Sequence, residues 1–80
     1  MRIDKFLKVS RLIKRRTVAD EACTNGHVSV NGKTVKSSYE VKEGDLLEIS
    51  FGERKLRARV REVREHAPKD AAGEMYEVIG

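Results

Sequence analysis

Apolar residues recur at helical spacing at the start of the chain and predict an amphipathic helix over residues 2–9. Its buried face carries Ile3, Phe6, Leu7 and Val9. A second helix is predicted over residues 18–24, with Thr17 as its N-cap. Asn25 and Gly26 follow, and both tolerate the left-handed backbone that ends a helix. The first third of the chain should therefore be a pair of short helices.

Beyond residue 27 the pattern changes to an alternation of period two, which indicates β-strands. Residues 28–30 and 33–35 flank Asn31-Gly32, a pair that favours the type I′ turn of a β-hairpin. Tyr39 and Val41 are expected to pack inward from an irregular connection. Further strands are predicted over residues 46–51, 55–61 and 75–79. A short helix is predicted to start at Pro68, with the proline in its first turn.

Charge is distributed very unevenly along the chain. Residues 1–16 hold seven Lys and Arg against one Asp, a net charge of +6, and the remaining ten cations face twelve carboxylates. The net charge of +4 therefore comes from the first fifth of the protein. Such asymmetry is typical of a surface that meets a polyanion.

The strongest concentration of charge lies in the segment between the two predicted helices, residues 10–17, which we call the basic turn. It contains Arg11, Lys14, Arg15 and Arg16 and no acidic residue. We expect Arg16 to be an exposed side chain beside the start of the second helix. The free N–H groups and dipole of that helix end would favour the same anion.

A second basic strip, Lys55, Arg57, Arg59 and Arg61, is predicted on one face of the strand over residues 55–61. It is either the solvated outer face of a sheet or a second phosphate-contacting surface. We favour the solvated face, because acidic neighbours such as Glu48, Glu53 and Glu62 can neutralise it across strands.

The sequence offers little for catalysis or for metal and cofactor binding. His27 and His66 are far apart and lack metal-ligand spacing, and no phosphate loop or nucleophile motif is present. Cys23 is the only cysteine and is expected to be a buried packing residue. Aromatic residues make up 5% of the chain, too few for a platform of several stacking rings. Eighty residues suggest one domain, residues 1–80, and no segment resembles a membrane span or signal peptide. We expect a cytoplasmic, non-enzymatic protein that needs no cofactor.

An ordered series of short motifs closely resembles the S-four (alpha-L) RNA-binding domain family. The series comprises Arg2-Ile3-Asp4-Lys5-Phe6-Leu7, Ser10-Arg11, Arg15-Arg16-Thr17, residues 26–32 and residues 41–45. The resemblance implies an α+β fold, in which short helices pack on a small, mostly antiparallel sheet. It also implies that RNA lies across the helix pair and the hairpin that follows.

Within this family the chain most resembles small bacterial members that serve ribosome-associated quality control. This resemblance implies binding to large ribosomal subunits that carry stalled peptidyl-tRNA, with contacts to large-subunit rRNA and P-site tRNA. It also implies support of RqcH during C-terminal alanine tailing, by a protein that we expect to be a monomer. The RNA-binding positions that carry over are Arg2, Lys8, Arg11, Lys14, Arg15 and Arg16.

Three alternatives remain open. One is a heat-shock, ribosome-recycling member of the family, which the lack of a long basic C-terminal extension disfavours. Another is an accessory subunit of an RNA-modifying complex. A small DNA-binding protein is disfavoured, because no second long helix follows the basic turn to enter a major groove.

Overall fold

The computed structural model describes all 80 residues, and it has the predicted α+β class. The helices are α1 (Ile3–Val9) and α2 (Arg16–Thr24). The strands are β1 (Val28–Val30), β2 (Lys33–Thr34), β3 (Leu46–Phe51), β4 (Arg54–Val60) and β5 (Tyr76–Val78), with a 3-10 helix, η1 (Ala72–Met75), before the last strand. Neither α-helix has the length and apolar character needed to cross a bilayer.

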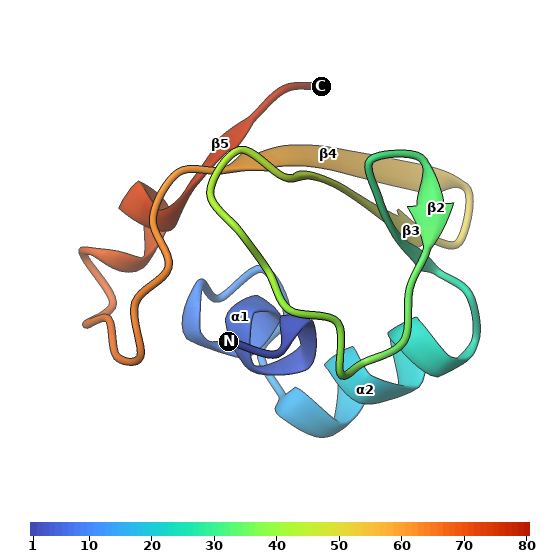
Figure 1. Cartoon of the computed structure of the whole chain (residues 1–80), viewed down its shortest axis with the longest axis horizontal. Coiled ribbons are helices and arrows are strands. Elements are labelled where there is room, and N and C mark those ends of the chain that lie inside the picture. The colour runs from blue at the N-terminus through green and yellow to red at the C-terminus, as the bar shows by residue number, and fades with distance from the viewer.

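The five strands form one antiparallel sheet in the order β2-β1-β3-β4-β5. The helix pair covers one face of this sheet (Figure 1). The segment between β2 and β3 runs from the sheet to the helices and back to the sheet, and it connects the two layers (Figure 1). There the Ile3 N–H donates to the Tyr39 carbonyl at 2.8 Å, and the Val41 N–H donates to the Met1 carbonyl at 2.9 Å. Tyr39 and Val41 pack against the core, as predicted.

The core fills the space between the helix pair and the inner face of the sheet. Its members come from both layers and include Phe6, Leu7, Cys23, Leu47 and Ile49. Cys23 is therefore the buried packing residue that the sequence predicted, and burial raises the pKa of its thiol to about 11. A thiol held protonated in this way is a poor nucleophile at neutral pH.

The hairpin prediction is confirmed in detail. Asn31 and Gly32 both have positive φ, 52° and 88°, as a type I′ turn requires. The Asn31 side chain also joins the turn to β3, because its Oδ1 accepts from the Leu46 N–H at 3.0 Å and its Nδ2 donates to Asp45 at 3.2 Å. The buried Asp45 carboxylate in turn accepts from the Tyr39 hydroxyl at 3.0 Å. Burial, and then this bond, raise the pKa of the Tyr39 phenol.

Two predicted helix starts are wrong by more than one residue, whereas the other element bounds agree with the prediction to within one residue. Helix α2 begins at Arg16 rather than Val18, and Thr17 is not its cap: the extended N-cap is Arg15, which makes no side-chain capping bond. The helix starts there because the Arg15 carbonyl already accepts from the Ala19 N–H at 3.0 Å. Pro68 starts only a turn, in which its carbonyl accepts from the N–H groups of Ala71 and Ala72, and helix η1 begins at Ala72.

Candidate RNA-binding surface

The basic turn is anchored from inside and exposes its cations. Ser10 and Ile13 are buried, and the Ile13 N–H donates to the Leu7 carbonyl at 3.0 Å, which folds the chain back over the end of α1. Arg11 has a φ of 65°, and its N–H donates to the Lys8 carbonyl at 3.1 Å. This is the left-handed position after a helix where Gly is usual. Placing Arg there costs conformational energy and fixes the direction of its side chain.

Four of the six predicted RNA-binding residues are exposed and take part in none of the ion pairs of the structure. They are Lys8, Arg11, Lys14 and Arg15. Their charges repel one another and have no internal partner. A polyanion that lies across the turn would relieve this repulsion.

The other two predicted residues, Arg2 and Arg16, share one buried carboxylate. Asp4 is only 4% exposed, and it lies 3.2 Å from Arg2 Nε and 3.5 Å from Arg16 Nε. Asp4 also accepts from the Lys5 N–H at 2.8 Å. Because both guanidinium groups remain half exposed, each can still meet a ligand. Asp4 thus holds the beginnings of α1 and α2 together, a role that the sequence pattern did not indicate.

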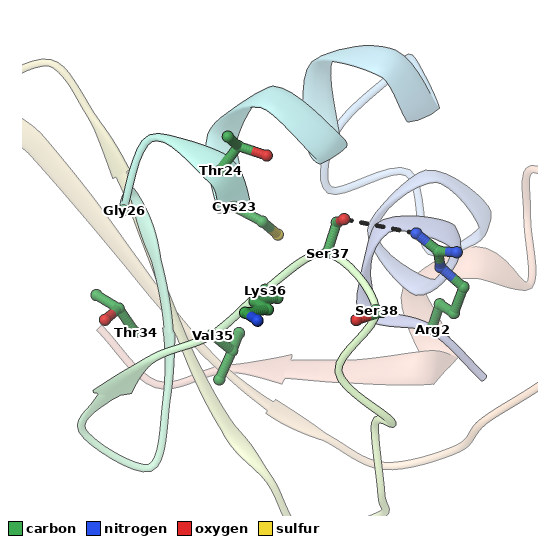
Figure 2. Close-up of a pocket in the computed structure, with 9 residues that line it drawn as sticks. All are labelled: Arg2, Cys23, Thr24, Gly26, Thr34, Val35, Lys36, Ser37 and Ser38. Carbon is green, nitrogen blue, oxygen red and sulfur yellow. Dashed lines mark hydrogen bonds between the residues drawn. The ribbon is translucent and has the colours of Figure 1, made fainter.

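Arg2 also borders a cleft with a volume of about 680 Å³ (Figure 2). Its guanidinium donates to the Ser37 hydroxyl at 3.5 Å across the mouth of this cleft. The lining contains no carboxylate; besides Arg2 it is Cys23, Thr24, Gly26, Thr34, Val35, Lys36, Ser37 and Ser38. Lys36 and the serines therefore extend the basic surface past Arg2. Their connection has no regular pattern, so nothing in the sequence placed them there.

Lys8 and Arg11 line a second, smaller cleft together with Glu65 and His66, with a volume of about 240 Å³. The segment that carries His66 is held beside α1 by an ion pair between Lys5 and Glu65 at 3.1 Å. His66 thus lies near Lys8 and Arg11, although more than fifty residues separate it from either of them in the sequence.

The basic strip of β4 and the following Arg61 lies on the face of the sheet opposite the helices and is partly neutralised, because two carboxylates pair with three of its four cations. Glu48 lies 3.2 Å from Arg57 and 3.6 Å from Lys55, and its hydrogen bond with Arg57 is the main cause of its lowered pKa. Arg61 pairs with Glu77 at 4.0 Å, and Arg59 donates to the Gly44 carbonyl at 3.0 Å. The predicted neutralisation is correct for Glu48. It is wrong for Glu62, which pairs with Arg64, and for Glu53, which forms no ion pair.

Histidine, cysteine and carboxylate groups do not gather anywhere in threes at a distance suited to a metal ion. His27 and His66 are both exposed. What the surface offers is a set of fixed and mobile cations, with hydroxyl groups beside Arg2. This donor set is suited to binding phosphate groups.

A helix pair with a basic turn, packed on a hairpin-led antiparallel sheet, defines an RNA-binding module. The chain belongs to the S4 domain family, whose family model matches residues 1–47. Over nearly its whole length it is also similar to proteins named RQC P-site tRNA stabilizing factor. The protein of Halalkalibacterium halodurans is 51% identical over 78 residues, covering 98% of this chain and 89% of the relative. The protein of Bacillus subtilis is 47% identical over 79 residues, covering 99% of this chain and 92% of the relative.

The solved structure of Vibrio cholerae Heat Shock Protein 15 superposes with a TM-score of 0.91 and 24% identity, covering 99% of this chain and 81% of that one. This similarity confirms the fold. It does not distinguish a quality-control factor from a heat-shock protein, whereas the relatives of about 50% identity carry the former name.

Proposed function

We propose that this protein is a non-enzymatic RNA-binding factor of ribosome-associated quality control, of the RqcP type. The observation that carries the proposal is the basic turn, whose backbone is anchored in the core and whose Arg11, Lys14 and Arg15 are exposed without an ion-pair partner, as is Lys8 just before it. The names of the relatives support the assignment to P-site tRNA on a ribosome.

Phosphate binding follows from the chemistry of the basic turn. Arg11, Arg15 and Arg16 have planar guanidinium groups that can hold a phosphate through two parallel hydrogen bonds. Lys8 and Lys14 add charge without fixed geometry. The first N–H groups of α2 have no partner within the helix and lie beside Arg15 and Arg16. These contacts read the shape and charge of folded RNA rather than its base sequence.

The partners follow from the same assignment. The large ribosomal subunit that carries a stalled peptidyl-tRNA would supply two RNA surfaces, large-subunit rRNA and the P-site tRNA. By holding that tRNA in place, the protein would support RqcH during C-terminal alanine tailing, and the chemistry of tailing would belong to that partner complex. We propose that residues 1–80 act as one domain and bind as a monomer.

Co-sedimentation with large ribosomal subunits tests the proposal. Arg11→Gln with Arg15→Gln should largely abolish sedimentation, because the variant loses two unpaired cations of the basic turn. The matched control is Arg57→Gln with Arg61→Gln, which removes the same charge from two ion-paired residues of the strip and should sediment nearly as well as the unchanged protein. Equal loss in both variants would mean that net charge alone drives binding. Co-migration with a modifying enzyme in place of large subunits would support the accessory-subunit alternative.

A further inference from the structure

Two exposed apolar side chains, Val18 and Phe51, line a groove that phosphate binding on the basic turn does not explain. Each is 45% exposed. The groove has a volume of about 280 Å³ and lies between α2 and the end of β3. Its lining is Ile13, Val18, Glu21, Ala22, Asn25, His27, Ser50, Phe51 and Gly52. Two half-exposed apolar side chains that line the same groove form a small apolar patch, and such patches are found where a protein meets a ligand.

Phe51 lies on the helix side of the sheet, just beyond the core. It follows Leu47 and Ile49 in the alternation of β3, and both of those side chains are buried. Its register partner across the turn is Arg54, which therefore lies on the same face and forms no ion pair. Phe51, Arg54, Lys55 and Leu56 also line an adjoining depression of about 270 Å³. The ring thus has a cation beside it.

The groove is continuous with the basic turn. Ile13, which lines the groove, belongs to that turn and precedes the exposed Lys14. An RNA strand with its phosphates on Lys14 and Arg15 would therefore pass the open side of the groove, with Arg54 at the far end for a further phosphate.

We propose that the Phe51 groove takes one unpaired base of the RNA bound on the basic turn, stacked on the Phe51 ring. The proposal rests on the proposed function, since it assigns a second kind of contact to the same RNA. Aromatic rings stack on bases of every kind, and cations beside them hold the flanking phosphates. The groove has room for a single base, and its position between the exposed Lys14 and the unpaired Arg54 favours a nucleic acid as the occupant. Glu21 in its wall is an acceptor for the amino group of such a base.

A tryptophan introduced by Phe51→Trp tests the stacking directly, because the chain has no other tryptophan. The probes are a stem-loop RNA with an unpaired loop and a fully paired RNA duplex of equal charge. Stacking predicts that the stem-loop quenches the fluorescence and the duplex does not. The matched control is Val78→Trp on the edge strand β5, where the native side chain is 55% exposed, and its fluorescence should not change.

Affinity measurements complete the test. Phe51→Ala and Phe51→Leu should weaken stem-loop binding roughly 5- to 100-fold, whereas Phe51→Tyr should retain it. Unchanged stem-loop affinity in Phe51→Ala, or equal quenching by both RNAs, would overturn the proposal. So would a variant that keeps its RNA affinity but sediments poorly with large subunits, which would make the occupant a protein. If the unchanged protein does not sediment with large subunits but stacking is seen, only the proposed function fails.

Discussion

At the scale of one residue, Arg11 occupies a backbone conformation that costs stability, although its charge has no ion-pair partner within the protein. An L side chain in left-handed backbone costs roughly 1–2 kcal/mol, a penalty that Gly avoids. Gly in turn loses about 0.5–1 kcal/mol through the greater freedom of the unfolded chain. Compared with Gly, Arg at a φ of 65° therefore lowers stability by up to about 1.5 kcal/mol.

Arg11→Gly should therefore raise the free energy of unfolding slightly or leave it unchanged, while RNA affinity falls roughly 10- to 100-fold, as expected for a lost charge-assisted contact. Thermal unfolding and RNA titration on the same preparation measure both quantities. Arg11→Ala is the control, since it removes the charge and keeps the backbone strain; it should lose affinity without any gain in stability. A lower unfolding temperature for Arg11→Gly would show that the side chain is structural.

At the scale of the elements, sequence patterns predicted some helix and strand bounds and failed to predict others. The Asn31-Gly32 turn and the bounds of β3 were predictable, because local backbone preference and alternation specify them. The start of α2 was not, because no capping side chain marks Arg15. The burial of Asp4 and the approach of His66 to Lys8 were not predictable either. These positions depend on tertiary packing between segments far apart in the chain. The RNA-binding role of the basic residues remains a prediction.

The shared carboxylate between the two helices predicts a coupling between Arg16 and Asp4. Arg16→Ala should lower the free energy of unfolding by about 1 kcal/mol. This loss is larger than for a typical exposed ion pair, because Asp4 is buried. It is smaller than for a fully buried pair, because Asp4 still contacts Arg2 and the Lys5 N–H. In an Asp4→Ala background the same change should cost almost nothing in stability but still weaken RNA binding. Denaturant unfolding of the four proteins of this cycle measures the coupling. Additive losses would show that the two side chains act independently.

At the scale of the whole molecule, the two proposed kinds of RNA contact are phosphate contacts on the basic turn and base stacking on Phe51. Their dependence on salt concentration should differ. RNA affinity should fall with KCl concentration, with a log–log slope of roughly −0.7 to −0.9 for each phosphate contact. Arg15→Gln should make this slope shallower by about one contact, whereas Arg57→Gln should leave it unchanged, because Arg57 is already paired with Glu48.

Phe51→Ala should weaken binding at every salt concentration and keep the slope, because stacking releases no counterions. Titrations of these variants over a range of KCl therefore separate the two kinds of contact. A flat dependence for the unchanged protein would contradict the electrostatic basis of binding, and a shallower slope for Phe51→Ala would mean that the ring acts by positioning Arg54 rather than by stacking.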